Sequence, residues 1–382
     1  MQSQSNLKKK GLYNGLATMI VSHLCIFVVM SGRFISQRRY MTKPFISICI
    51  ITKDEEPFLL KTLEYLSKQS YWKENFEIII VDWNSKDNTI KSADEFLNKE
   101  WVQHTIVNEK EYENKWWWYD YWHSFARNIS IDLVSKKSKY VAQIDADCRA
   151  DEKWLESLYE KISKAENDNK IAWAGWPRLV ETKWNISKFE LMLNNYFCSY
   201  IMTLWNPAYC VRKWIKYIPS IAWYNSIYKA EIIKKYMFNT AYATFFDDIE
   251  INYRLSKDWY KFLYCPEAKI WHRLDETFWQ FLKHMQKYWW WAAKMTKYYK
   301  AIPRLYVVLS LWYLLYMLAL IPLLFWSWIF ILPYILVFLL ATAVFIENFR
   351  KTKSLISLWV YPLAFLHPLM YGWWFVKELF MK

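Results

Sequence analysis

The chain has 382 residues, of which 54% are hydrophobic and 23% are charged. This length and composition exclude a disordered protein, a collagen-like fibre and a small disulfide-linked scaffold. Lysine and arginine number 50 against 36 aspartate and glutamate, and half of the net charge of +14 lies in the first 43 residues. Because the other charges are dispersed and basic residues lie beside apolar segments, we expect membrane lipids rather than nucleic acid as partners.

Residues 1–43 form a basic and partly apolar N-terminal segment. Residues 12–35 are apolar but interrupted by Asn14, His23 and Arg33, a pattern that fits a signal anchor. It fits equally well an extension upstream of a start at Met41, because the residues that follow Met41 resemble the beginning of a first strand. The sequence leaves both interpretations open, and with them the question of whether residues 1–40 belong to the natural protein.

Between Met41 and Lys300, short apolar runs alternate with amphipathic stretches. The apolar runs predict buried strands at Phe45–Thr52, Phe76–Val81, Gln103–Val107 and Tyr140–Ile144. The amphipathic stretches predict helices at Leu59–Leu66, Asn88–Leu97, His123–Val134 and Lys153–Ile162. This alternation is typical of an α/β fold with a Rossmann-like, mostly parallel sheet and helices on both faces. In such sheets, ligands bind at the carboxyl ends of the strands.

Acidic residues follow two of the predicted strands. Asp82 ends the second strand, and Asp145-Ala146-Asp147 follows the fourth. Two carboxylates one residue apart can bind a single Mg²⁺ or Mn²⁺ ion while a diphosphate completes its coordination shell. The alternative is a turn whose aspartates cap the next helix.

A second acidic pair, Asp247-Asp248, precedes the helical stretch Ile249–Leu255. The helix dipole favours acids at a helix start, which is a purely structural explanation. The functional explanation is that one of the two carboxylates faces a cleft and acts as a general base. The pair alone does not distinguish these interpretations.

The C-terminal region carries the strongest hydrophobic signal. Leu305–Ile346 spans 42 residues without Asp, Glu, Lys or Arg, enough for about 63 Å of helix, or twice the roughly 30 Å hydrocarbon core. We therefore expect two membrane spans that turn near Trp326-Ser327-Trp328. A basic loop follows at 350–353, and Ser354–Val376 would be a third span or a re-entrant segment. The positive-inside rule predicts a multi-pass protein of the cell (inner) membrane whose preceding domain is cytoplasmic.

Six segments that carry these and other polar residues occur in a fixed order along residues 44–300: Ile50–Glu55, Ile80–Thr89, Ala126–Asn128, Asp145–Asp147, Asp247–Leu255 and Pro266–His272. In type and order they resemble the motifs of family 2 glycosyltransferases with the GT-A fold. The resemblance implies a metal-assisted, inverting transfer of sugar from a nucleotide sugar to a hydroxyl of a lipid-linked or glycan acceptor.

The resemblance also implies a role for each matching residue. Nucleotide-sugar binding would involve Thr52, Glu55, Asp82, Arg127 and Asp145. Mg²⁺ or Mn²⁺ would be bound by Asp145, Asp147 and His272, and catalysis would depend on Asp248 as the general base with Asp247 beside it. Trp83 stands where the family usually has a second acid, so selectivity for the nucleotide base is not determined.

The implied organisation has four parts. An N-terminal segment at 1–43 precedes a catalytic domain at 44–277. An amphipathic helix at 278–304 would lie on the membrane surface, because it is aromatic and basic, and residues 305–382 would form the membrane domain. A processive polysaccharide synthase of the same superfamily and a non-catalytic membrane adaptor remain alternatives. The sequence does not identify the sugar, the nucleotide, the acceptor or the oligomeric state.

The composition has one further anomaly, which is 26 tryptophans against 5 glycines. Glycine normally accounts for about 7% of residues, and it serves where the backbone needs a positive φ or a close approach. In this chain, tryptophan occupies positions where similar proteins commonly have glycine: Trp83, Trp122, Trp223, Trp259, Trp289 and Trp291. Because UGA is read as glycine in some genetic codes and as tryptophan in others, our hypothesis is that many tryptophans are mistranslated glycines. The alternative is a genuinely aromatic-rich membrane protein.

Overall fold

The computed structural model describes residues 43–115, 122–175, 177–180, 186–199, 211–220, 222–240, 247–273, 277–300 and 305–380. The interpretations of residues 1–42 concern a segment outside these ranges. Residues Phe45–Lys382 form one unit, separate from the N-terminal segment.

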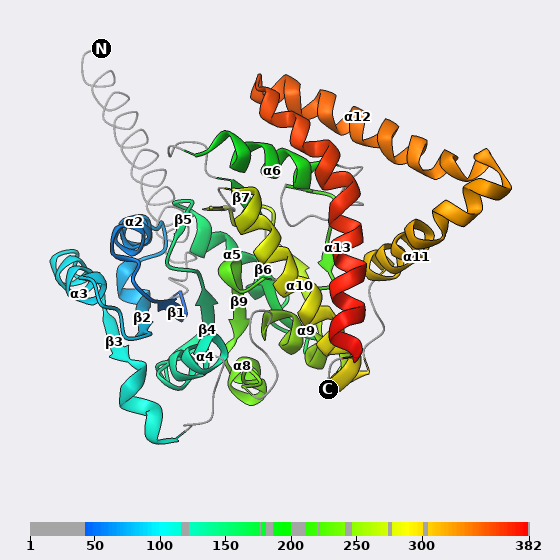
Figure 1. Cartoon of the computed structure of the whole chain (residues 1–382). Helices are drawn as coiled ribbons and strands as arrows, with labels where there is room; N and C mark the ends of the chain where they lie inside the picture. The colour runs from blue at the N-terminus through cyan, green and yellow to red at the C-terminus, as the bar shows by residue number, and fades with distance from the viewer. Residues whose placement is uncertain are drawn as a thin grey trace, which may run out of the picture. The chain divides into compact units, whose positions relative to one another are not determined.

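An eight-stranded sheet organises the first part of this unit (Figure 1), in the order β3-β2-β1-β4-β9-β6-β10-β8. Its first four strands run parallel to one another. They are β1 (Phe45–Thr52), β2 (Phe76–Asp82), β3 (His104–Asn108) and β4 (Ser138–Gln143). Each lies within two residues of its predicted bounds, so the apolar runs identified these strands correctly.

The other half of the sheet departs from the prediction of a mostly parallel arrangement. Strand β9 (Ser226–Lys229) lies antiparallel between β4 and β6 (Ile171–Gly175). Strand β10 (Lys261–Tyr264) is parallel to β6, and β8 (Tyr217–Ile218) is antiparallel to β10 at the edge. The sheet is therefore mixed. Strand β9 enters it after a long connection, and the periodicity of side chains predicts that a segment is a strand but not the direction in which the strand joins the sheet.

The alternation of side chains along β1 explains why helices cover both faces of the sheet. Ile46, Ile48 and Ile50 contribute to one hydrophobic core, whereas Cys49 and Ile51 face the opposite side. The first core contains α2 (Glu56–Ser67), α3 (Thr89–Lys99) and α5 (Trp154–Ser163). The opposite face is covered by α4 (Trp122–Asp132), α8 (Ala230–Tyr236) and α9 (Asp247–Lys257). The sheet is thus buried on both sides, as expected for an α/β fold.

A separate three-stranded sheet, which the sequence did not predict, has the order β5-β11-β7. Its strands are β5 (Cys148–Ala150), β11 (Ile270–His272) and β7 (Arg178–Val180). Strand β11 is antiparallel to β5, and His272 pairs with Cys148 in its register. This pairing joins segments that are more than a hundred residues apart.

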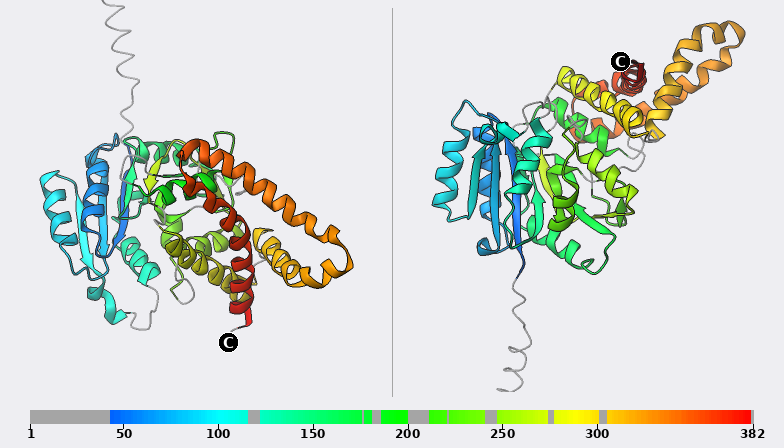
Figure 2. Two further views of the ribbon diagram at one scale, coloured as in Figure 1. Left: turned by 45° about the horizontal axis from the view of Figure 1, so that its top comes forward. Right: turned by 90° about the horizontal axis from the view of Figure 1, so that it is seen from below.

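The C-terminal helices α11 (Leu305–Trp326) and α12 (Leu332–Thr352) form the predicted hairpin, which turns through a short 3-10 helix at Trp328–Ile331. Figures 1 and 2 show this hairpin projecting from the rest of the unit. Trp328–Thr352 and Leu355–Phe380 are the described helical segments long and apolar enough to cross a membrane, by length and composition alone. The second includes α13 (Val360–Phe380), so the stretch predicted as a span or a re-entrant segment has the length of a span.

The amphipathic helix predicted before these spans is α10 (Phe278–Tyr299), which starts with a capping box between Thr277 and Gln280. Its apolar side chains, including Phe281 and Trp289, are buried in a core that also contains residues of α13 and of α6 (Lys188–Cys198). The helix is therefore confirmed, but protein covers the face that we expected to lie on a membrane.

Candidate active site

The loop between β4 and β5 brings two of the predicted metal ligands against His272. Asp145 and Asp147 occupy a tight turn in which the amide of Cys148 donates to the carbonyl of Asp145 at 3.3 Å. Because β11 pairs with β5, the Nε2 atom of His272 lies 3.3 Å from Asp147 Oδ1 and 3.6 Å from Asp145 Oδ2. Ligand atoms of Asp147, Cys148 and His272 all lie within 4.8 Å of one another.

The charges in this cluster stabilise one another. Burial alone would lower the pKa of His272, but the carboxylates of Asp147 and Asp145 outweigh it and raise that pKa. Burial conversely favours the neutral form of Asp145, yet His272 and the positive charge of Arg127 lower its pKa. Burial and then the charge of Asp147 raise the pKa of Glu55 to about 7. The charge of Asp147 therefore acts on Glu55 as well as on His272.

Helix α9 starts at the second acidic pair, whose two carboxylates have different surroundings. Asp247 is 1% exposed, forms an ion pair with Arg127 and accepts a hydrogen bond from Ser124. Asp248 accepts a bond from the backbone amide of Trp223 at 3.4 Å. Burial, and next the charge of Asp247, raise the pKa of Asp248 to about 7. Asp247 is thus neutralised by a cation, whereas Asp248 is poised to exchange a proton near neutral pH.

Arg127 is the common neighbour of the two acidic clusters. Its guanidinium pairs with Asp247, and its charge also lowers the pKa of Asp145. The resemblance implies a role for Arg127 in nucleotide-sugar binding, which stays a prediction, and in the structure its guanidinium is paired with Asp247. The charge of one buried cation thus acts on both clusters.

The carboxyl ends of β1 and β2 form the adjoining part of the site. The Asp82 carboxylate is 2% exposed and accepts hydrogen bonds from the amide and hydroxyl of Ser85 and from Asn108 Nδ2. The hydroxyl of Thr52 is buried without a hydrogen-bond partner among the described residues. A buried hydroxyl of this kind has an unfilled capacity for a ligand.

Sequence reasoning missed three residues that shape the site. The hydroxyl of Thr62 in α2 lies 2.6 Å and 2.7 Å from the carbonyl oxygens of Ala146 and Cys148, and so holds the loop between the acids. Ser124 supports Asp247. Burial and then Arg127 lower the pKa of His123 to about 3, which keeps this histidine neutral between the two clusters. Only the position of His123 and Ser124 just before the Ala126–Asn128 motif could have signalled them.

Comparisons with known proteins agree with this architecture. The family model described as "Glycosyl transferase family 2" matches residues 47–237. Glycosyltransferase GlyG of Streptococcus pneumoniae serotype 4 is 28% identical over 123 residues, which cover 32% of this chain and 36% of that protein. A dolichyl N-acetyl-alpha-D-glucosaminyl phosphate 3-beta-D-2,3-diacetamido-2,3-dideoxy-beta-D-glucuronosyltransferase of Methanococcus voltae is 42% identical over 71 residues, or 19% of this chain and 21% of that protein. Each of these matches thus covers 36% of the relative's length or less.

Among solved structures, the chain is similar to the mannosyltransferase PcManGT from Pyrobaculum calidifontis in complex with GDP-Man and Mn²⁺, with a TM-score of 0.52 and 14% identity. The similarity covers 96% of this chain and 97% of that protein. At this level of identity, the similarity establishes the shared fold alone.

Proposed function

The chain belongs to glycosyl transferase family 2, and from that premise we propose an inverting, metal-assisted transfer from a nucleotide sugar to a hydroxyl of a membrane-associated or glycan acceptor. The observation that carries the proposal is the cluster of Asp145, Asp147 and His272, which Arg127 links to the pair Asp247 and Asp248.

The first cluster has the donor set of a site for a small divalent cation. Carboxylate oxygens and an imidazole nitrogen suit Mn²⁺, and the carboxylates suit Mg²⁺. We assign Asp145, Asp147 and His272 as the residues that would hold the ion. A bound cation would neutralise charge that develops on the leaving diphosphate. PcManGT, which has the same fold, is described in complex with GDP-Man and Mn²⁺.

Asp248 is our proposed general base. Its pKa of about 7 allows the carboxylate to accept a proton from an acceptor hydroxyl near neutral pH. Asp247 is paired with Arg127 and so has a positioning role in this proposal. With the base and the diphosphate on opposite sides of the sugar, direct attack by the hydroxyl inverts the anomeric carbon and needs no nucleophilic side chain.

The edge formed by β1 and β2 would receive the nucleotide. Thr52 offers an unpaired buried hydroxyl, and Asp82 lies at the end of the next strand with its carboxylate held by Ser85 and Asn108. Ligands bind at this edge in open α/β sheets. Glu55, at the start of α2, follows β1 closely in the chain, and its pKa responds to the charge of Asp147.

The exposed hairpin supports a membrane location. Only 11% of the apolar window in Trp328–Thr352 is buried, unlike the core helix of a soluble protein. Arg350 and Lys351 lie in its last turn and Lys353 follows it. By the positive-inside rule, these residues and the catalytic domain would be on the cytoplasmic side of the inner membrane, as parts of a multi-pass chain. An acceptor linked to a lipid phosphate would be within reach there, and the name of the Methanococcus voltae relative describes such an acceptor.

Two measurements test the proposal. Calorimetry with Mn²⁺ and a set of nucleoside diphosphates should show that each ligand binds more tightly in the presence of the other. If neither the cation nor any nucleoside diphosphate binds, the chain would be a non-catalytic adaptor instead. A screen of radiolabelled nucleotide sugars against membrane extracts should then yield a single-sugar product. Formation of polymer without added acceptor would favour a processive synthase instead.

A further inference from the structure

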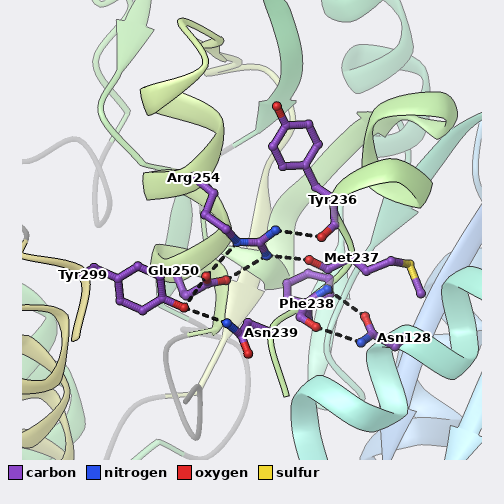
Figure 3. A network of polar contacts seen from close by, with 8 residues as sticks. All are labelled: Asn128, Tyr236, Met237, Phe238, Asn239, Glu250, Arg254 and Tyr299. Carbon is purple, nitrogen blue, oxygen red and sulfur yellow. Dashed lines mark hydrogen bonds and ion pairs between the residues drawn. The ribbon is translucent and has the colours of Figure 1, made fainter. Parts of the chain in front are cut away.

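We propose that Arg254 is a positioning residue for Asp248, and that Tyr299 connects the same network to α10. This inference rests on the proposed role of Asp248 as the base. Figure 3 shows the network, which joins three helices through the segment at 236–239.

Arg254 uses its whole guanidinium group. Its Nε and Nη2 atoms donate to the two carboxylate oxygens of Glu250 at 2.7 Å and 2.9 Å. Nη1 donates to the carbonyl of Tyr236 at 2.7 Å, and Nη2 donates to that of Met237 at 2.5 Å. Glu250 lies on the first turn of α9 and is 1% exposed. A bidentate pair fixes direction as well as distance, so Arg254 ties the start of α9 to the end of α8.

The same segment is held from its other side by α4. Asn128 donates to the carbonyl of Phe238 at 2.9 Å and accepts from its amide at 2.8 Å. Met237, between the two attachments, has a φ of 45°, a conformation that persists only where the surroundings enforce it. Asn128 follows Arg127 directly, and Arg127 pairs with Asp247. The network therefore sets the position of α9, which carries Asp247 and the proposed base Asp248, relative to α4, which carries Arg127.

Tyr299 extends the network to the last turn of α10. Its hydroxyl donates to Glu250 at 2.7 Å and accepts from Asn239 at 2.8 Å, while its carbonyl accepts from Tyr253 at 3.1 Å. Helix α10 precedes the apolar helices and packs in the same core as α13. Tyr299 thereby connects α10 to Glu250, which lies two residues from Asp248 in the first turn of α9.

Arg254→Lys tests the proposal, because lysine keeps the charge and loses the planar fork. We expect kcat to fall by about 10- to 100-fold, as for a small misplacement of a reacting group, with the KM for the donor and the melting temperature close to those of the parent. Tyr299→Phe should also lower kcat, and it provides a second test of the network if the lysine variant does not fold. Lys257→Ala, exposed on the same helix, is the matched control.

A kcat at the parental level in both folded variants would overturn the positioning role while leaving Asp248 in place. Parental turnover in Asp248→Asn would instead remove the base itself, so the two failures are distinguishable.

A second inference rests on different observations, namely the backbone at two tryptophans. We infer that residues 101 and 259 are glycine in the natural polypeptide. Trp101 has a φ of 55° and Trp259 a φ of 66°, in the left-handed region, whereas none of the described glycines has a positive φ. Their side chains are 89% and 78% exposed, so no packing explains the choice of an indole.

Both residues occupy the same position in the same helix-ending motif. After α3, the amide of Trp101 donates to Asn98 and that of Val102 donates to Leu97. After α9, the amide of Trp259 donates to Ser256 and that of Tyr260 donates to Leu255. These are the two hydrogen bonds of a Schellman motif, whose left-handed residue is usually glycine because a Cβ is unfavourable there.

The buried tryptophans form two groups, according to whether the indole nitrogen has a hydrogen-bond acceptor among the described residues, and this division agrees with the inference. The indole nitrogen of Trp154 donates to Asn225 at 2.8 Å, as expected for a native buried tryptophan. Those of Trp173, Trp223 and Trp289 are buried without an acceptor among the described residues. Residues 44–382 contain all 26 tryptophans but only Gly175 and Gly372. The backbone argument does not extend to Trp83, because there the positive φ of 51° falls on Asn84.

Peptide mass spectrometry of the protein from its source organism tests this inference, together with the codons of its gene. We expect glycine and TGA at 101 and 259, and tryptophan and TGG at 154. In the recombinant chain, Trp101→Gly and Trp259→Gly should each raise the melting temperature by about 2–4 °C. Trp279→Gly, exposed in the helical first turn of α10, should lower it. TGG codons or tryptophan masses at 101 and 259 would overturn the inference.

Discussion

The imidazole Nε2 of His272 lies 3.3 Å from the carboxylate of Asp147, although 125 residues separate them in the chain. The pairing of β11 with β5 produces this contact. The imidazole nitrogen therefore lies beside the two carboxylates that we propose as ligands of the cation, where it could be the third ligand.

Removing either side chain should weaken cation binding. We expect Asp147→Asn and His272→Ala each to raise the dissociation constant for Mn²⁺ by at least about 10-fold, because the first removes the negative charge of a carboxylate ligand and the second removes a nitrogen ligand. Titration calorimetry in the presence of a nucleoside diphosphate measures this constant. Glu267→Gln, an exposed acid near β11, should bind Mn²⁺ like the parent. Equal affinities in all variants would refute the assignment.

The rate of transfer should depend on the protonation of Asp248. Because burial and Asp247 raise its pKa to about 7, the base is increasingly ionised above that pH, and kcat/KM should increase with pH through about 7. Asp248→Asn should reduce turnover by about 10²- to 10⁴-fold while leaving nucleotide binding intact. A rate that does not change between pH 5.5 and 8 would contradict the assignment of Asp248 as the base.

The same carboxylate should destabilise the folded protein at alkaline pH. Its pKa rises from 3.8 to about 7 on folding, so the folded state binds more protons and stability is lost as pH rises through this window. At pH 8, Asp248→Asn should therefore unfold with a free energy higher by on the order of 2 kcal/mol. Denaturation in detergent at pH 8 and pH 4 checks the sign, since the gain should disappear at pH 4.

The exposed face of α12 should tolerate charge in water but not in a membrane. Leu339 is 58% exposed, and Leu339→Arg would cost about 2.5–3.5 kcal/mol in the middle of a bilayer. On a water-exposed surface, the same change would have an effect within about 0.5 kcal/mol. We expect this variant to lose membrane association in a carbonate-wash assay.

Trp72→Arg, at a site 52% exposed beside the sheet, provides the comparison and should behave like the parent. Equal membrane fractions for the two variants would argue against insertion of the hairpin.

The sequence by itself determined the elements whose signal is local. The runs at Phe45–Thr52 and Phe76–Val81 predicted β1 and β2, and the uncharged stretch Leu305–Ile346 predicted the hairpin and its turn. Side-chain periodicity reports a strand or a helix within a few residues, and hydrophobic length reports a span. The acidic motifs could likewise be recognised in the sequence, because the six segments resemble the motifs of a known family in type and order.

Tertiary structure alone decided what those acids face. Pairing across long separations placed β9 antiparallel in the sheet and brought His272 to Asp147, and it paired Arg127 with Asp247. It also covered the apolar face of α10 with α13, where an amphipathic pattern alone predicted lipid. Periodicity specifies that a face must be buried but not which partner buries it, and the choice of partner is what creates the site.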